Sequence, residues 1–229
     1  MKTYALIVAA GRSERCGGPT PKQFRFLHGR PLLAWTISRF EAANLIDKIV
    51  VVVAEDALIY TGKMIVDPYG FEKVEKIVIG GETRRESVFN GLKSLPLSTG
   101  LVAIQDGARP LTNPSDIDRV VETAARERAA MLAVPSTDTV KRVKEGFIIG
   151  TLDRRTLYLA QTPQVFQYDL ILAAHKEVQP GEDVTDDASL LEARGFKVKV
   201  VEPTATNLKV TTSDDLLLAE TLIAREQNG

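Results

Sequence analysis

The alternation of short apolar runs with amphipathic segments constrains the fold of this chain more than any other feature. Two runs, at residues 4–10 and 48–54, lack the polar alternation of a half-exposed strand and therefore indicate buried parallel strands. Three further strands are expected at residues 74–79, 101–106 and 131–135. Segments expected to be helical lie between them, at residues 31–40, 55–65, 84–95 and 114–126. This alternation predicts an α/β fold with a doubly wound, mostly parallel sheet, which binds ligands at the carboxyl ends of its strands.

Residues 136–160 interrupt this pattern. Two short extended segments flank Glu145-Gly146 and predict a protruding β-hairpin. A two-stranded hairpin is marginally stable alone, so we expect it to pack against a second subunit or to form a flap on its own chain. The chain then returns to the sheet with a short edge segment over 161–166, a helix over 168–178 and a strand over 196–201. We predict a single domain over 1–229, with the hairpin arm as an excursion.

Composition and charge exclude several classes of protein. The 229 residues are 44% hydrophobic and carry a net charge of −1, so no global field attracts nucleic acid or a membrane. No apolar stretch is long enough to cross a bilayer, and the apolar run after Lys2 is too short for a signal peptide. Cys16 is the only cysteine, so no intrachain disulfide can form and a cytoplasmic location is expected.

The loop after the first strand is rich in glycine, proline and positive charge. Its backbone can approach a ligand closely because of Gly11, Gly17, Gly18, Pro19 and Pro21. One acid, Glu14, stands against four basic residues, which are Arg12, Arg15, Lys22 and Arg25. Backbone N–H groups and cations of this kind suit a polyphosphate. The loop does not contain the P-loop pattern Gly-x-x-x-x-Gly-Lys-Ser/Thr. It also lacks the dinucleotide fingerprint Gly-x-Gly-x-x-Gly, because Ser13 stands where the second glycine would be.

Three further points on the predicted carboxyl edge carry polar residues. Gly80-Gly81 precede a helix start that contains Ser87, which suits a ligand or a plain capped helix. Asp106 ends an apolar strand and can hold a hydroxyl or a metal ion, while Arg109 can hold a phosphate; alternatively the two residues fix a turn. Lys209 lies in an extended run. It can belong to the site, or it can be an ordinary solvated lysine.

The sequence offers no protein nucleophile. His28 and His175 lack metal-ligand spacing and are predicted to lie on the surface, and Cys16 has no recognisable catalytic partner. No Gly-x-Ser-x-Gly pattern occurs. If the protein joins two phosphorylated molecules, the substrate phosphate can be the nucleophile, and arginine, lysine and Mg²⁺ suffice to align it and offset charge.

Several motifs together resemble those of one family. The set comprises Ala-Ala-Gly-x(5)-Gly-x(3)-Pro-Lys-Gln, Asp-Gly-Ala-Arg-Pro, Thr-Asp-Thr-Val-Lys-Arg, Asp-Arg, Gln-Thr-Pro-Gln, Val-Thr-Asp-Asp-Ala-Ser and Asn-Leu-Lys-Val-Thr. The first resembles nucleotidyltransferases of the sugar-nucleotide pyrophosphorylase type. The whole set, in order from Ala5 to about Asp215, resembles the 2-C-methyl-D-erythritol 4-phosphate cytidylyltransferases of non-mevalonate isoprenoid precursor biosynthesis.

The resemblance implies that CTP and methylerythritol phosphate, with Mg²⁺, give a CDP-alcohol and pyrophosphate. It assigns catalysis to the basic residues Arg15, Lys22 and Lys209. It assigns nucleotide binding, largely through backbone groups, to Ala9, Ala10, Gly11, Gly81 and Ser87. It assigns the polyol phosphate to Asp106, Arg109, Thr139, Arg154, Thr162 and Thr185. In the family Thr139 and Arg154 come from the neighbouring subunit, which implies a homodimer through the arm.

Other functions stay open at this point. A ribitol 5-phosphate cytidylyltransferase shares most of these motifs. A non-catalytic nucleotide-binding regulator is disfavoured because Arg15, Lys22 and Lys209 occur together, and a dinucleotide-dependent dehydrogenase lacks its glycine fingerprint. The chain departs from the family at Ser13, often glycine, and at Gly107, often alanine.

Overall fold

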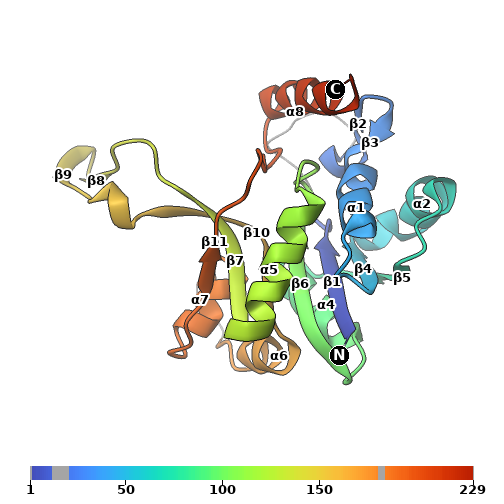
Figure 1. Ribbon diagram of the computed structural model, residues 1–229, viewed down its shortest axis with the longest axis horizontal. Helices are drawn as coiled ribbons and strands as arrows, with labels where there is room; N and C mark the ends of the chain where they lie inside the picture. The colour runs from blue at the N-terminus through green and yellow to red at the C-terminus, as the bar shows by residue number, and fades with distance from the viewer. Residues whose placement is uncertain (1, 12–20, 180–183, 229) are drawn as a thin grey trace.

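The computed structural model describes residues 2–11, 21–179 and 184–228. Its centre is a seven-stranded sheet in the order β11-β7-β10-β6-β1-β4-β5 (Figure 1). Its strands are β1 (Lys2–Val8), β4 (Lys48–Val53), β5 (Val74–Ile79), β6 (Thr99–Asp106), β7 (Ala129–Pro135), β10 (Tyr158–Gln167) and β11 (Lys199–Val201). Only β10 runs antiparallel to its neighbours. The predicted doubly wound, mostly parallel sheet is confirmed.

Helices cover both faces of this sheet. α1 (Leu32–Ala42) and α5 (Pro114–Glu127) pack on one face, in front in Figure 1. The other face is covered by α4 (Arg84–Ser94), α6 (Tyr168–Lys176) and α7 (Asp187–Glu192). Each face of the sheet has its own hydrophobic core, and strand β1 contributes to both. Ala5 and Ile7 belong to the core under α1 and α5, while Leu6 belongs to the core under α4, α6 and α7. Glycine at position 91 lets α4 approach closely, because a Cβ there would overlap the side chain of Leu6.

The expectation of an edge segment over 161–166 is wrong. These residues belong to β10, a ten-residue strand that lies inside the sheet between β6 and β7. Pro163 has no N–H to donate and would interrupt a regular ladder. The register against β7 shifts between Ala160 and Gln164, so the proline lies at an irregularity rather than within regular pairing.

The helix expected over 55–65 is broken into four pieces. They are η3 (Glu55–Ala57), α2 (Leu58–Thr61), the π-helical η4 (Gly62–Val66) and α3 (Asp67–Tyr69). The segment ends at Gly70, which has a left-handed φ of 60°. The helical character was predicted, but the changes of hydrogen-bond pattern were not.

A third, smaller core joins the segment around residues 27–35 to the C-terminal helix. The 3-10 turn η2 (Lys22–Phe24) leads into a small hairpin of β2 (Phe26–Leu27) and β3 (Arg30–Pro31). The C-terminal helix α8 (Ser213–Asn228) packs here, where Ala219 and Ile223 join Val210, Leu27 and Trp35. Burial of Val210 anchors the preceding extended segment beside the carboxyl edge of the sheet. None of the helices described is both long and apolar enough to cross a membrane.

The arm projects from the body of the molecule (Figure 1). Strands β8 (Lys141–Lys144) and β9 (Phe147–Thr151) form a separate two-stranded sheet, followed by the 3-10 turn η5 (Arg154–Thr156). Glu145 and Gly146 make the turn with φ values of 50° and 83°, as a tight hairpin turn requires. The predicted hairpin is confirmed, and all its strand residues are exposed.

Candidate active site

A cleft opens at the carboxyl ends of β1 and β6, where a doubly wound sheet binds ligands. We call it the β1–β6 cleft. It is lined by Val8, Ala9, Ala10, Gly11, Lys22, Gln23, Gly81, Glu82, Thr83, Arg84, Ser87, Asp106, Gly107, Ala108 and Lys209. Every described residue assigned to the nucleotide by family resemblance therefore lies on one cleft.

Small residues and side-chain hydrogen bonds shape the walls of this cleft. Gln23 donates from Nε2 to the carbonyl oxygens of Ala9 and Gly11, at 3.0 and 3.3 Å, and so fixes the start of the loop after β1. On the opposite wall the Gly81 N–H donates to Ser87 Oγ at 3.0 Å. A Cβ at Gly80 would lie 2.6 Å from Ala10 Cβ, so glycine lets the two walls meet. The N-terminus of α4 is closed by a capping box, in which the Glu86 N–H donates to Thr83 Oγ1 and the Thr83 N–H donates to Glu86 Oε2.

Two lysines from distant parts of the chain reach the cleft. Lys22 Nζ donates to the carbonyl oxygen of Val210 at 3.0 Å. Lys209 Nζ lies 2.7 Å from Asp106 Oδ2. The Val210 N–H donates to the Ala108 carbonyl at 2.9 Å, which fastens the segment carrying Lys209 to the loop after β6. The two ammonium groups therefore converge on the same end of the cleft.

A second space, which we call the β6–β10 pocket, adjoins the cleft. It is lined by Arg84, Asp106, Arg109, Ala160, Gln161, Thr162, Gln164, Thr185, Asp186 and Lys209. The Asp106 N–H donates to Thr162 Oγ1 at 3.0 Å, which joins the ends of β6 and β10. Arg84, Asp106 and Lys209 line both spaces, so these three residues form the border between them.

Four charged side chains, those of Arg84, Asp106, Arg109 and Lys209, lie close together at this border. Burial alone would raise the pKa of Asp106, but Arg84, Lys209 and Arg109 outweigh it and lower the pKa to about 2. Burial lowers the pKa of Arg109, which is 7% exposed. Arg109 Nη1 donates to the Asn207 carbonyl at 2.6 Å, while Nε has no hydrogen-bond partner among the described residues. A buried donor of this kind suits an anionic ligand.

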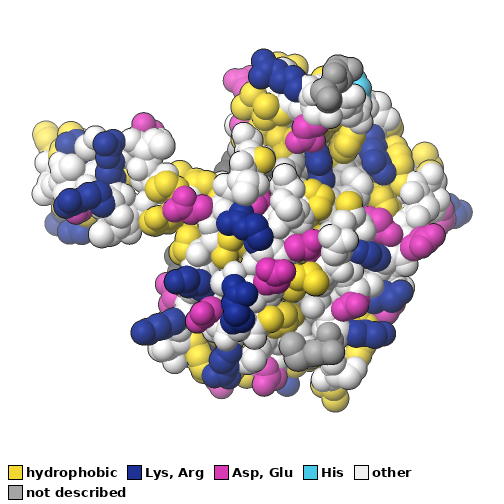
Figure 2. Space-filling view, viewed as in Figure 1, with side chains coloured by type: hydrophobic (Ala, Val, Ile, Leu, Met, Phe, Trp, Pro, Cys, Tyr) yellow, Lys and Arg dark blue, Asp and Glu magenta, His cyan; other side chains and the backbone are white. Residues whose placement is uncertain are grey.

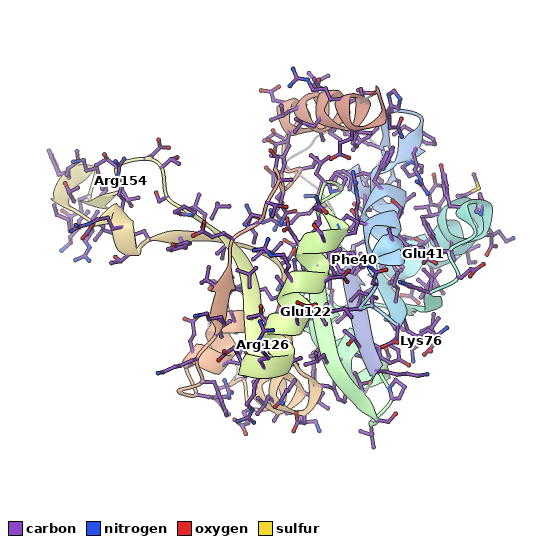
Figure 3. All side chains as sticks on the ribbon, in the orientation of Figure 1. Phe40, Glu41, Lys76, Glu122, Arg126 and Arg154 are labelled. Atoms are coloured by element: carbon purple, nitrogen blue, oxygen red, sulfur yellow. The ribbon has the colours of Figure 1, made fainter. Side chains whose placement is uncertain are left out.

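The predicted arm residues lie apart from both spaces. Thr139 and Arg154 are exposed, and Figure 3 places Arg154 on the arm, away from the sheet. Arg154 Nη1 donates to the Thr137 carbonyl at 2.8 Å. Arg15, the remaining catalytic prediction, lies outside the described residues. The structure therefore brings together the predicted residues of the body, but not those of the arm.

Sequence reasoning missed several residues that organise this site. Asn207 donates from Nδ2 to the Thr162 carbonyl at 2.9 Å and accepts from Thr112. Gln164 accepts from the Ala188 N–H at 2.9 Å and donates to Asp186. Asn207 and Gln164 fall inside the recognised motifs, but their partners are distant in sequence. Arg84 follows Gly80-Gly81 by a few residues, and this nearness to a candidate ligand-binding loop is what could have indicated that Arg84 belongs to the site.

The surroundings of Asp106 do not favour direct contact between its carboxylate and a metal ion. Asp106 is the one acid that the sequence offered as able to hold either a hydroxyl or a metal ion, and its two oxygens face Arg84 and Lys209. Within residues 2–11, 21–179 and 184–228, no three His, Cys, Asp or Glu side chains gather in a way that could hold a metal. A carboxylate so surrounded by cations does not suit a divalent metal.

Comparison with known proteins places this site in a family. A family model described as 2-C-methyl-D-erythritol 4-phosphate cytidylyltransferase matches residues 3–225. The chain belongs to this family. The cytidylyltransferase of Pelotomaculum thermopropionicum is 44% identical over 228 residues, which cover 99% of this chain and 96% of that protein. Membership of the cytidylyltransferase family confirms the resemblance inferred from the motifs.

Two solved structures of cytidylyltransferases share the fold. The 4-diphosphocytidyl-2C-methyl-D-erythritol synthase of Anaerococcus prevotii has a TM-score of 0.85 at 30% identity, covering 97% of this chain and 96% of that chain. The 2-C-methyl-D-erythritol 4-phosphate cytidylyltransferase of Thermus thermophilus has a TM-score of 0.77 at 32% identity, covering 96% and 98%. The similarity therefore extends along nearly the whole chain.

Proposed function

We propose that this chain transfers CMP from CTP to 2-C-methyl-D-erythritol 4-phosphate and releases pyrophosphate. One observation carries the proposal: two adjoining spaces share a border made of Arg84, Asp106 and Lys209. The β1–β6 cleft, with its small residues and glycine walls, is suited to the nucleotide. The polar β6–β10 pocket is suited to the polyol phosphate. Lys209 then lies where the two substrates meet.

The reaction requires no nucleophile from the protein. A phosphate oxygen of the polyol phosphate attacks the α-phosphorus of CTP, and the bond from that phosphorus to the β-phosphate oxygen breaks. Pyrophosphate leaves with the electron pair. The protein aligns the two substrates and offsets the charge of the transition state. We assign this role to Lys22 and Lys209, and by family resemblance to Arg15. Mg²⁺ and a cytoplasmic location stay predictions.

Selectivity for cytosine is the first test of the proposal. The wall around Gly81 and Ser87 is tightly packed, so a purine is expected to be too large for it. Pyrophosphate release with methylerythritol phosphate should be strong with CTP, weaker with UTP and near background with ATP or GTP. Equal activity with ATP would contradict the cytidylyltransferase proposal, and no activity with any nucleotide would favour a non-catalytic regulator.

We also propose that the arm completes the site of a second copy of the chain. Its exposed apolar residues include Val143, Phe147, Ile148 and Ile149, of which Phe147 is 76% exposed. Figure 2 shows hydrophobic and basic side chains on the arm. Exposed large apolar side chains gathered on one small hairpin suit a protein interface. A two-fold partner would cover this surface and receive Thr139 and Arg154, the substrate positions that the arm carries.

A further inference from the structure

Arg84 joins two acids that come from different elements. Its Nε donates to Asp106 Oδ1 at 3.1 Å, and its Nη1 donates to Asp187 Oδ2 at 2.8 Å. Arg84 and Asp106 line both substrate spaces, whereas Asp187, at the start of α7, lines neither. The Asp187 side chain therefore contacts the border of the two spaces through Arg84.

Asp187 is itself held by a buried histidine. The predicted surface position of His175 is wrong, because its side chain is 0% exposed and that of Asp187 is 1% exposed. His175 Nε2 lies 3.1 Å from Asp187 Oδ1, and since a carboxylate can only accept, the ring donates through Nε2. Burial would raise the pKa of Asp187, but Arg84 and His175 outweigh burial and lower it. Phe89 of α4 stacks on the histidine ring with the planes 5° apart.

We infer that Asp187 and His175 are positioning residues, which hold Arg84 so that Arg84 orients the carboxylate of Asp106 between the substrates. The inference rests on the proposed function. Arg84 binds one oxygen of Asp106 and Lys209 binds the other, so the carboxylate is fixed from two sides. A guanidinium can bridge two acids in this way because its donors form a rigid planar fork.

Loss of this bridge would affect one substrate more than the other. Without Arg84, the Asp106 carboxylate is free to turn toward Arg109, whose Nε lies 3.9 Å from Oδ2. Asp106 would then present its oxygens differently to the polyol phosphate in the β6–β10 pocket. The walls that hold the nucleotide base, around Gly81 and Ser87, have hydrogen bonds of their own and would be unchanged.

Two variants test the inference by different routes. Asp187→Asn keeps the side-chain shape but removes the charge that holds Arg84. Arg84→Lys keeps the positive charge but cannot bridge both acids. Each is expected to raise KM for the polyol phosphate about ten-fold or more, since small misplacements at an active site are costly. KM for CTP should stay within about two-fold of wild type, because base binding is not disturbed.

Asp118→Asn provides the control. Asp118 also accepts hydrogen bonds from a distant segment, from the N–H groups of Asn44 and Leu45 at 3.1 and 2.8 Å, but it lies on α5 and lines neither space. This variant is expected to lower the melting temperature and leave both KM values at wild type. Circular dichroism checks the fold of all three variants. The Arg84 side chain is 33% exposed, so Arg84→Lys is expected to fold even if Asp187→Asn does not.

Wild-type turnover is measured first, because its absence would refute the proposed function and not this inference. A selective rise in KM for the polyol phosphate, in each test variant that folds, supports the positioning role. Wild-type kinetics in folded Arg84→Lys or Asp187→Asn would overturn it. The same rise in Asp118→Asn would also overturn it, since the effect would then reflect a general loss of stability.

Discussion

Replacing Lys22 with alanine is expected to lower kcat by about a hundred-fold or more. Loss of one preorganised group that stabilises transition-state charge typically costs that much. Lys22 lines the β1–β6 cleft, and its ammonium is held beside the segment that carries Lys209. The measurement is steady-state pyrophosphate release with CTP and methylerythritol phosphate at saturating concentrations.

Folding and charge are controlled separately in this experiment. Lys22 lies in a short 3-10 turn and not in the core, so the melting temperature of the alanine variant should stay close to wild type. Lys63→Ala is the control for loss of a positive charge. Lys63 is an exposed residue of η4 that lines neither space, so its replacement should leave kcat unchanged. Near-normal turnover in Lys22→Ala would remove this lysine from the mechanism.

Mixing two inactive variants is expected to restore activity if the arm acts on a partner subunit. Lys22→Ala damages the body of the site, and Arg154→Ala damages the arm. If Arg154 acts in trans, each mixed dimer holds one doubly damaged site and one intact site. Random pairing makes about half of the dimers mixed, so about a quarter of wild-type activity should return after joint unfolding and refolding.

The same experiment gives a different result if the arm acts on the site of its own chain. If Arg154 serves the site of its own chain, every site in a mixed dimer carries one damaged residue and no activity returns. Mass spectrometry of differently tagged chains verifies that mixed dimers have formed. Activity that stays at the level of the separate variants, with mixed dimers present, would contradict the shared site.

The sheet and most of the site could be predicted because both depend on local sequence. Buried parallel strands are uninterrupted apolar runs, so their ends were visible in the sequence. Gly81, Asp106 and Lys209 were recognised as residues next to such ends or within motifs. Since the carboxyl ends of parallel strands meet at one edge, residues far apart in sequence could be placed together.

The remaining features depend on long-range contacts or irregular backbone. Pro163 disfavours a central strand, yet a register shift accommodates it inside the sheet. The partner of His175 is Asp187, on another helix, so no local spacing revealed the pair. A signal did exist, because Tyr168, Ile171 and His175 follow one buried face of α6. The Arg84 bridge could not be foreseen, since it needs two elements to meet.

The most direct test of the proposed reaction compares two acceptors under the same conditions. Purified protein with CTP and Mg²⁺ is given either 2-C-methyl-D-erythritol 4-phosphate or ribitol 5-phosphate, and pyrophosphate and the CDP-alcohol are quantified. We predict that methylerythritol phosphate gives both products in equal amounts and that ribitol phosphate gives little of either. A preference for ribitol phosphate, or no CDP-alcohol from methylerythritol phosphate, would contradict the account.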